Sequence, residues 1–289
     1  MLKAFPSYKL LVQGANGAIT EVSLPFTTQI STTREIQNSP AEANVTIYNL
    51  NMNNRENLYF DRYNFAGYRS FELYLGYGND LSLVFKGNVM ECYSVRSGVN
   101  FETHINAWDG GMFYISGFNS KTYNNTKVSD QIKSLMDEVK NGFVELGKMS
   151  PKIDENTSDI SRPQSYFGKT TDIIKNIVGK AFDVFTENEE MKIVKKDEVI
   201  SNGNITKISA KTGLLETPRK QEYTLEVTMM LEPKIQIGQA VELESVTAPR
   251  FNGTYKVIGV DHNALISENE SSENTTTVIL LYNSKYEKI

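Results

Sequence analysis

The stretch that decides the fold is residues 212–243, TGLLETPRKQEYTLEVTMMLEPKIQIGQAVEL. At its centre Tyr223, Leu225 and Val227 alternate with polar residues, which predicts a half-buried strand. Turn-forming residues bracket this strand and introduce the next one: Gly213, Pro218, Pro233 and Gly238. The combination of short alternating strands and regular turns favours a β-barrel.

Two further strands follow this stretch. Residues 251–262 read FNGTYKVIGVDH, in which Asn-Gly predicts a tight turn into a strand. Residues 275–282 predict the last strand. We therefore expect an all-β segment that begins after a boundary at residues 201–203 and runs to residue 289.

The amino-terminal part of the chain has the same β character. Asn16-Gly17 predicts a hairpin turn, and residues 53–60 predict a short helix that Asn53 or Asn54 caps. Alternating runs predict strands at residues 9–12, 19–24, 27–33, 43–48, 71–77, 81–85, 88–95 and 100–108. This close spacing favours a barrel or sandwich over an α/β domain.

The composition changes after Gly110-Gly111. Apolar residues at three- and four-residue spacing predict helices at residues 127–139 and 171–182. The polar residues 151–165 predict a loop, and two short apolar runs predict a hairpin at residues 183–195. The expected middle domain is therefore small and α+β.

The order of several short motifs resembles the central hub proteins of bacteriophage tail baseplates. In the carboxy-terminal part these motifs are Gly-Leu-x-x-x-Pro, a strand, Pro-x-x-x-x-Gly, and Asn-Gly-x-Tyr-x-Val-x-x-Val-x-His. In the amino-terminal part they are EANVTIYNL at 42–50, VFKG at 84–87 and THINAWDG at 103–110. The residues that carry the resemblance are Asn49, Leu50, Gly87, Asp109, Gly110, Gly213, Pro218, Pro233, Gly238 and Gly253.

The resemblance implies a mainly β fold, α+β overall. Two tail-tube-like β-barrel domains, residues 1–112 and 201–289, would flank a small α+β middle domain, residues 113–200. It also implies a homotrimer that adapts a hexameric tail tube above to a trimeric spike below, beside other baseplate proteins. DNA would pass through the lumen without specific binding, and the protein would be located in the virion after assembly in the host cytoplasm.

Composition excludes several other classes. A net charge of −5 and a pI near 5.3 argue against a protein that wraps nucleic acid, because that requires clustered Lys and Arg. We expect neither a membrane anchor nor a signal peptide, because the sequence has no long apolar run. Cys92 is the only cysteine, so an intrachain disulfide is excluded.

The sequence predicts no catalytic, cofactor or metal site. Only two histidines, His104 and His262, are available as bases or ligands, and neither has suitable partners nearby in sequence. The acidic clusters 187–190 and 268–273 are typical of solvated loops. We therefore expect a protein that acts through its surfaces rather than an enzyme.

One aromatic cluster is a candidate subunit interface, since Tyr and Phe are favoured there: Tyr59, Phe60, Tyr63, Phe65 and Tyr68. Three alternatives remain open at this stage. They are a hub-derived peptidoglycan hydrolase that uses Asp and Glu, the hub of a bacterial contractile injection or secretion system, and a stand-alone sugar-binding β protein.

Overall fold

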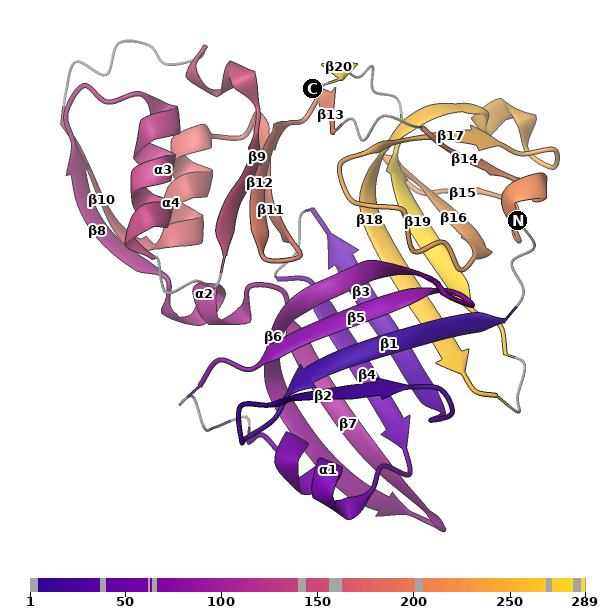
Figure 1. The fold of residues 1–289 in the computed structure, drawn as a ribbon. Coiled ribbons are helices and arrows are strands. Elements are labelled where there is room, and N and C mark those ends of the chain that lie inside the picture. Colours follow the sequence, from indigo (N-terminus) through magenta and orange to yellow (C-terminus); the bar gives the residue numbers. More distant parts are fainter. Residues whose placement is uncertain are drawn as a thin grey trace.

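One large sheet unites the two ends of the chain (Figure 1). The computed structural model describes residues 5–36, 40–61, 63, 67–139, 144–155, 163–200, 205–268, 272–282 and 287–288. Strands make up 54% of the structure and helices 17%, so the prediction of a mainly β fold is confirmed. The predicted domain boundary at residues 201–203 lies outside the described residues.

The amino-terminal strands form a half-sheet in the order β3-β4-β7-β6-β5-β1-β2. Their bounds are β1 Pro6–Gln13, β2 Ile19–Ser23, β3 Thr28–Glu35, β4 Glu42–Tyr48, β5 Ser70–Tyr77, β6 Asp80–Ser97 and β7 Asn100–Trp108. Every second residue of β4 is buried, as a strand with one face on a core requires. The half-sheet curls, so that Thr28 Oγ1 on β3 lies 2.7 Å from the Tyr8 hydroxyl on β1.

Two amino-terminal predictions need correction. Residues 81–85 and 88–95 belong to one long strand, β6, because Gly87 continues the pairing with β5 and breaks no strand. The short helix is α1, Met52–Leu58, and its cap is Asn51, whose side chain accepts a hydrogen bond from the Asn54 N–H.

The carboxy-terminal strands extend the same sheet. They are β14 Thr206–Ser209, β15 Arg219–Lys220, β16 Thr224–Met230, β17 Ala240–Glu244, β18 Gly253–Ile266 and β19 Thr275–Leu281. Leu225 and Val227 are buried as predicted, whereas Tyr223 precedes β16 and is 69% exposed. Short pieces β13 Glu198–Val199 and β20 Glu287–Lys288 pair separately.

Strand β18 joins the two β regions. It pairs with β19 on one side and with β3 on the other, from Gly259 opposite Glu35 to Ile266 opposite Thr28. The strand path runs from β15 to β2, and among the described residues these two end strands do not pair with each other. The sequence predicted two barrels. Strands of both β regions belong to one thirteen-stranded sheet, and no closed barrel is detected among the described residues, so the two-barrel architecture is not confirmed.

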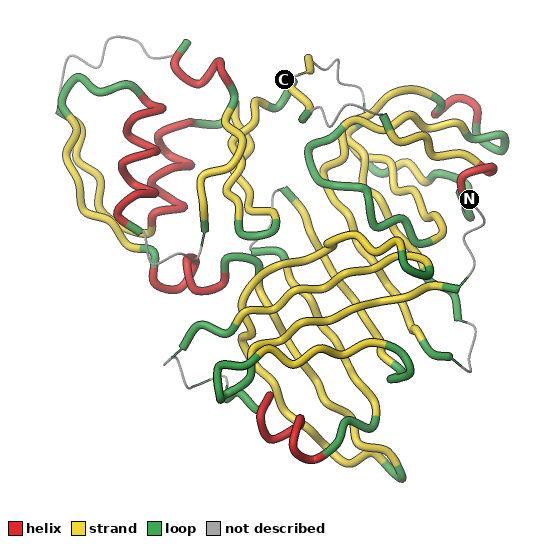
Figure 2. The backbone as a smooth tube through the Cα atoms, viewed as in Figure 1, coloured by secondary structure: helices red, strands yellow, loops and turns green. Residues whose placement is uncertain are grey.

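The middle segment is built in three layers (Figures 1 and 2). Its elements are α2 Gly111–Ser116, β8 Phe118–Tyr123, α3 Val128–Glu138, β9 Glu145–Met149, the 3-10 turn Pro151–Asp154, β10 Gln164–Lys169, α4 Thr170–Val178, β11 Phe182–Glu187 and β12 Glu190–Lys195. Helices α3 and α4 lie between the β8–β10 pair and the β9–β12–β11 sheet. Their apolar faces share one core with both sheets.

The sequence missed several elements here. It predicted neither α2 nor strands β8, β9 and β10, and the predicted loop 151–165 contains a 3-10 turn and the start of β10. The second helix ends at Val178 because Gly179 has a φ of 72°, so Phe182 belongs to β11.

The hydrophobic cores cross the predicted domain boundaries. Phe185 and Val194 of the middle segment pack in the carboxy-terminal core, and Leu231 and Ile266 of the carboxy-terminal part pack in the amino-terminal core. Within the described residues, no helix is both long and apolar enough to cross a bilayer. The three parts are therefore bound to one another by shared apolar packing as well as by strand pairing.

Candidate functional site

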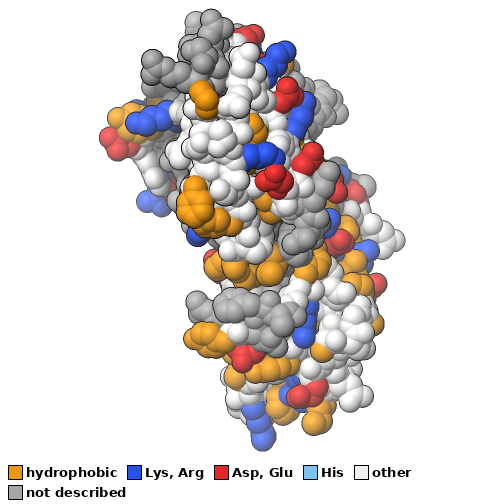
Figure 3. Space-filling view, turned by 90° about the vertical axis from the view of Figure 1, so that its left-hand side faces the viewer, with side chains coloured by type: hydrophobic (Ala, Val, Ile, Leu, Met, Phe, Trp, Pro, Cys, Tyr) orange, Lys and Arg blue, Asp and Glu red, His pale blue; other side chains and the backbone are white. Residues whose placement is uncertain are grey.

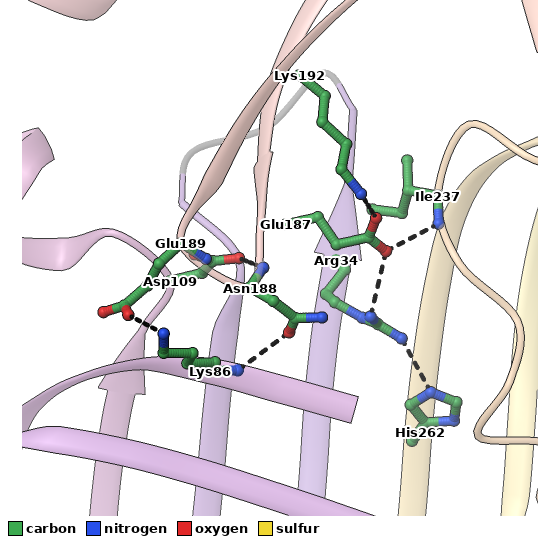
Figure 4. Close-up of polar contacts among 9 residues, drawn as sticks. All are labelled: Arg34, Lys86, Asp109, Glu187, Asn188, Glu189, Lys192, Ile237 and His262. Atoms are coloured by element: carbon green, nitrogen blue, oxygen red, sulfur yellow. Dashed lines mark hydrogen bonds and ion pairs between the residues drawn. The ribbon is translucent and has the colours of Figure 1, made fainter. Parts of the chain in front are cut away.

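The β11–β12 hairpin inserts its tip between the two β regions (Figure 4). Its two central residues, Asn188 and Glu189, have φ values of 56° and 63°. Positive φ at both central residues is typical of a type I′ hairpin turn, and Asn tolerates it better than Glu does. The turn must therefore be held in place by contacts from outside the hairpin.

Asp109 supplies the contact that fixes this turn. Its carboxylate accepts hydrogen bonds from the N–H groups of Asn188 and Glu189, each at 2.7 Å. The side chain is 1% exposed, and burial raises the pKa of Asp109 to about 7. The acidic residue of the amino-terminal motif is thus the clamp on a turn about eighty residues later in the sequence.

Glu189 connects the turn to the amino-terminal half-sheet. Its Oε2 lies 3.2 Å from Lys86 Nζ, and its Oε1 accepts hydrogen bonds from Asn88 Nδ2 at 3.0 Å and the Tyr68 hydroxyl at 3.1 Å. The Lys86 N–H donates to Asn188 Oδ1 at 3.1 Å. Both turn residues are therefore bound to β6 and its neighbours.

Glu187 connects the same hairpin to the carboxy-terminal region. Its Oε2 lies 2.7 Å from Lys192 Nζ. Its Oε1 lies 3.5 Å from Arg34 Nη1 and accepts a hydrogen bond from the Ile237 N–H at 3.2 Å. Because Glu187 is 1% exposed, its carboxylate is removed from water, and these three contacts offset the free-energy cost of that desolvation.

Arg34 extends the network to His262. Its Nη2 lies 3.0 Å from His262 Nε2, and His262 Nδ1 lies 2.8 Å from Thr276 Oγ1. Arginine can only donate, so His262 Nε2 accepts and Nδ1 carries the proton that is donated to Thr276. Burial and the Arg34 charge lower the pKa of His262 well below its ordinary value, so the ring is neutral.

This junction corrects one interpretation of the sequence. The acidic cluster 187–190 is no solvated loop, because Glu187 and Glu189 are buried. His262 is also buried within the chain. Lys192 is five residues from Glu187, but Arg34 and Lys86 come from distant parts of the sequence, so no local pattern could have indicated the burial.

Asp109→Asn is expected to flatten the pH dependence of stability between about pH 4 and 7. With its pKa raised from 3.8 to about 7, folded Asp109 holds a proton that the unfolded chain has released. Its stabilising contribution is therefore complete below about pH 4 and is lost as the pH rises through about 7. The difference between the two pKa values sets an upper limit of about 4 kcal/mol on the stability that Asp109 contributes and then loses over this pH range.

Urea unfolding of parent and variant at about pH 5 and 7.5 tests this expectation. Asp261, whose pKa burial raises to about 6, and His262 titrate in both proteins and cancel in the comparison. Asp80→Asn, at a carboxylate that is 53% exposed, should keep the parent's pH profile. An unchanged profile for Asp109→Asn would show that Asp109 is ionised throughout.

The other amino-terminal motif residues shape the backbone around this clamp. An added Cβ at Gly87 would lie 2.3 Å from the Trp108 carbonyl oxygen, so the backbones of the paired strands β6 and β7 approach each other closely there. Gly110 has a φ of 63° and is the N-cap of α2. Asn49 has a φ of 61° and holds residue Phe101 through both its backbone and its side chain, and Leu50 is buried beside it.

The carboxy-terminal motif residues lie in the turns between strands. Gly213 and Gly238 have φ values of 106° and 82°, which favour glycine. The Gly238 N–H donates to Val257 O at 2.8 Å, and its carbonyl accepts from the Ile200 N–H at 2.7 Å. The remaining motif residues are buried or begin a strand: Pro218, Pro233 and Gly253.

The aromatic cluster is divided between core and surface. Phe60 is 9% exposed and lies under the Arg69 guanidinium, and Tyr68 donates to Glu189 in the junction. Tyr59 and Tyr63 are 53% and 79% exposed, whereas Phe65 lies outside the described residues. The proposed interface therefore rests on Tyr59 and Tyr63.

The described residues contain no group of three or more His, Cys, Asp or Glu side chains suited to a metal ion. Cys92 is buried, and burial raises the pKa of its thiol to about 12, so it is a poor nucleophile. His104 lies on β7 with Nδ1 3.0 Å from Thr46 Oγ1 and Nε2 3.5 Å from Glu102.

Comparison with protein families gives one match over most of the chain. Residues 15–270 match the family described as Baseplate hub gp41. No curated protein sequence matches the chain.

Solved structures share the fold at low sequence identity. The 43 kDa tail protein of prophage MuSo2 from Shewanella oneidensis has a TM-score of 0.63 at 7% identity, over 96% of this chain and 97% of that one. The tail protein from Neisseria meningitidis MC58 has a TM-score of 0.59 at 10% identity, with 96% and 97% covered. The E. coli c3393 protein, a type VI secretion system component, has a TM-score of 0.61 at 10% identity, with 90% and 74% covered.

Proposed function

Because the chain belongs to the baseplate hub gp41 family, we propose that it forms a trimeric hub that adapts a hexameric tail tube to a trimeric spike. The family membership makes it a structural protein of the phage tail baseplate. The adaptor role adds a mechanism to that assignment. Each chain would contribute two β regions, so three chains would present six β regions to the tube. At the other end the trimer would keep its threefold symmetry, which matches a trimeric spike.

The observation that carries this proposal is the pairing of β18 with β3. It places the amino- and carboxy-terminal β regions side by side in one sheet within each chain. The buried junction of Asp109, Glu187 and Arg34 then holds the middle segment against both regions. Two β regions joined in this way suit an adaptor that must keep a fixed threefold-to-sixfold geometry. The division into domains 1–112, 113–200 and 201–289, each β region being a tail-tube-like barrel, remains part of the proposal.

The proposal predicts a solution mass of about three times the 32.6 kDa chain mass. Light scattering measures that mass, and electron-microscope views down the axis should show a ring with six lobes. Tyr59→Ser and Tyr63→Ser would weaken the trimer if these exposed aromatics lie in the subunit contact, with the core residue Phe60 left intact. A compact monomer at high concentration would contradict the trimer.

The remaining partners follow from the same proposal. A tail tube protein would lie above the ring, a spike protein below, and other baseplate proteins around it. DNA would pass through the lumen without specific binding, in keeping with the net charge of −5. The protein would be assembled in the host cytoplasm and located in the virion, and no enzymatic activity, cofactor or membrane anchor is proposed.

A second candidate is the hub of a bacterial secretion or contractile injection system. The fold it shares with the E. coli type VI secretion component favours this alternative. The trimer and the six-lobed ring are expected in both cases. Co-purification with tail tube and capsid proteins from phage particles would separate the phage hub from the secretion hub.

A further inference from the structure

A groove of about 630 Å³ crosses the outer face of β4, β7 and β6. Strand pairing places its residues in rows: Thr46, His104 and Tyr93 lie opposite one another in one row, and Asn44, Asn106 and Glu91 in the next. Residues between them, such as Val45 and Ile105, point into the core. The groove is therefore built from the side chains that alternation directs away from the core. Its size is ordinary for a binding site.

The walls of the groove offer aromatic and apolar surface. Trp108 and Tyr93 line it from the sheet, Tyr63 from the connection after α1, and Ile115 from α2. Tyr93, Tyr63 and Ile115 are 41%, 79% and 44% exposed. Figure 3, which views the left-hand side of Figure 1, shows hydrophobic side chains gathered in a band across the middle of the molecule.

Two acidic residues, Glu42 and Glu91, line the groove. Among the residues that the structure describes, no Lys or Arg lines it. Glu42 Oε1 accepts hydrogen bonds from Asn44 and Asn106. Glu91, in contrast, has neither a hydrogen bond nor an ion pair within the described part of the chain. A half-buried carboxylate without a cation favours binding of a positively charged group.

We propose that this groove binds an arginine-bearing basic segment of a partner protein. A guanidinium is planar, stacks on aromatic faces and pairs with a carboxylate through two N–H donors. The Tyr93 ring and the Glu91 carboxylate, two residues apart on one face of β6, offer both contacts to one arginine. A saccharide would use the aromatic faces but would leave the Glu91 charge uncompensated. This inference goes beyond the proposed hub role, because it assigns the groove to a partner protein other than a second copy of the chain.

The single tryptophan of the chain reports on the groove, since Trp108 lines it. The peptide acetyl-Gly-Arg-Gly-Arg-Gly-amide, titrated into the full chain, is expected to change the Trp108 emission saturably, with a Kd of about 1 mM or tighter. The matched lysine peptide should bind several-fold more weakly, and the matched glutamate peptide should give no saturable change.

Two groove variants and one distant control complete the test. Glu91→Gln and Tyr93→Leu are each expected to weaken arginine-peptide binding about fivefold or more. Glu21→Gln, an exposed carboxylate on β2, should leave it unchanged. Far-UV circular dichroism establishes that the variants fold, and Glu91→Gln removes no contact within the described residues, so it tests the site even if Tyr93→Leu misfolds.

Three outcomes would overturn the proposal. The first is the absence of a saturable response to the arginine peptide. The second is a Glu91→Gln variant that binds the peptide as tightly as the parent. The third is a saturable response to N-acetylglucosamine oligomers in place of the peptide, which would make the groove a saccharide site.

Discussion

Arg34→Ala is expected to lower the free energy of unfolding by about 3–5 kcal/mol. The Arg34 guanidinium is almost fully buried and contacts both Glu187 and His262. Its removal leaves Glu187 with Lys192 as its remaining cationic partner and leaves His262 Nε2 without its donor. Buried polar groups that lose a partner are far more destabilising than broken surface ion pairs. The urea concentration at half-unfolding, with the slope unchanged, measures the loss.

Arg96→Ala is the matched control, because Arg96 is exposed and donates to the Gly98 carbonyl at 3.2 Å. It should change the free energy of unfolding by less than about 0.5 kcal/mol. Glu187→Gln, combined with Arg34→Ala, should cost less than the sum of the two single variants, because the second change removes the charge that the first left unpaired. Strictly additive losses would show that Arg34 and Glu187 do not stabilise each other.

Local periodicity explains why most strands could be predicted. Leu225, Val227 and Met229 alternate with polar residues and are all buried in β16. The alternation is visible in the sequence because it depends only on neighbours two residues apart. The same reasoning failed at Tyr223, which continues the pattern but lies before the first paired residue, Thr224.

Long-range contacts explain what could not be predicted. The pairing of Thr28 with Ile266 joins opposite ends of the chain, and nothing near either residue specifies its partner. The acidic hairpin tip is a similar case, because Glu187 and Glu189 read as solvated until Arg34 and Lys86 are seen beside them. The motif order drew attention to Gly87 and Asp109 without indicating what they contact; the close backbone approach and the hydrogen bonds to the hairpin turn are visible only in the structure.

Gly87→Ala is expected to lower the free energy of unfolding by about 2–4 kcal/mol, although it adds a single methyl group. The new Cβ would lie 2.3 Å from the Trp108 carbonyl oxygen, 2.8 Å from its carbon and 3.0 Å from Asp109 Cα. All three are backbone atoms, which cannot rotate away as the end of a side chain can. The backbones of β6 and β7 must therefore move apart at this point. Thermal unfolding should show a midpoint lowered by roughly 5–10 °C.

The displacement should also reach the hairpin turn, because Asp109, the residue after Trp108, accepts the hydrogen bonds from Asn188 and Glu189. Trp108 emission should shift in the folded variant, and Asp109→Asn should cost less in the Gly87→Ala background than alone, since the clamp is already displaced. Gly67→Ala is the matched control, because no atom lies within 4 Å of its added Cβ. If Gly87→Ala unfolds at the temperature of Gly67→Ala, the backbones of β6 and β7 have room to adjust. The motif glycine is then required for something other than close backbone contact.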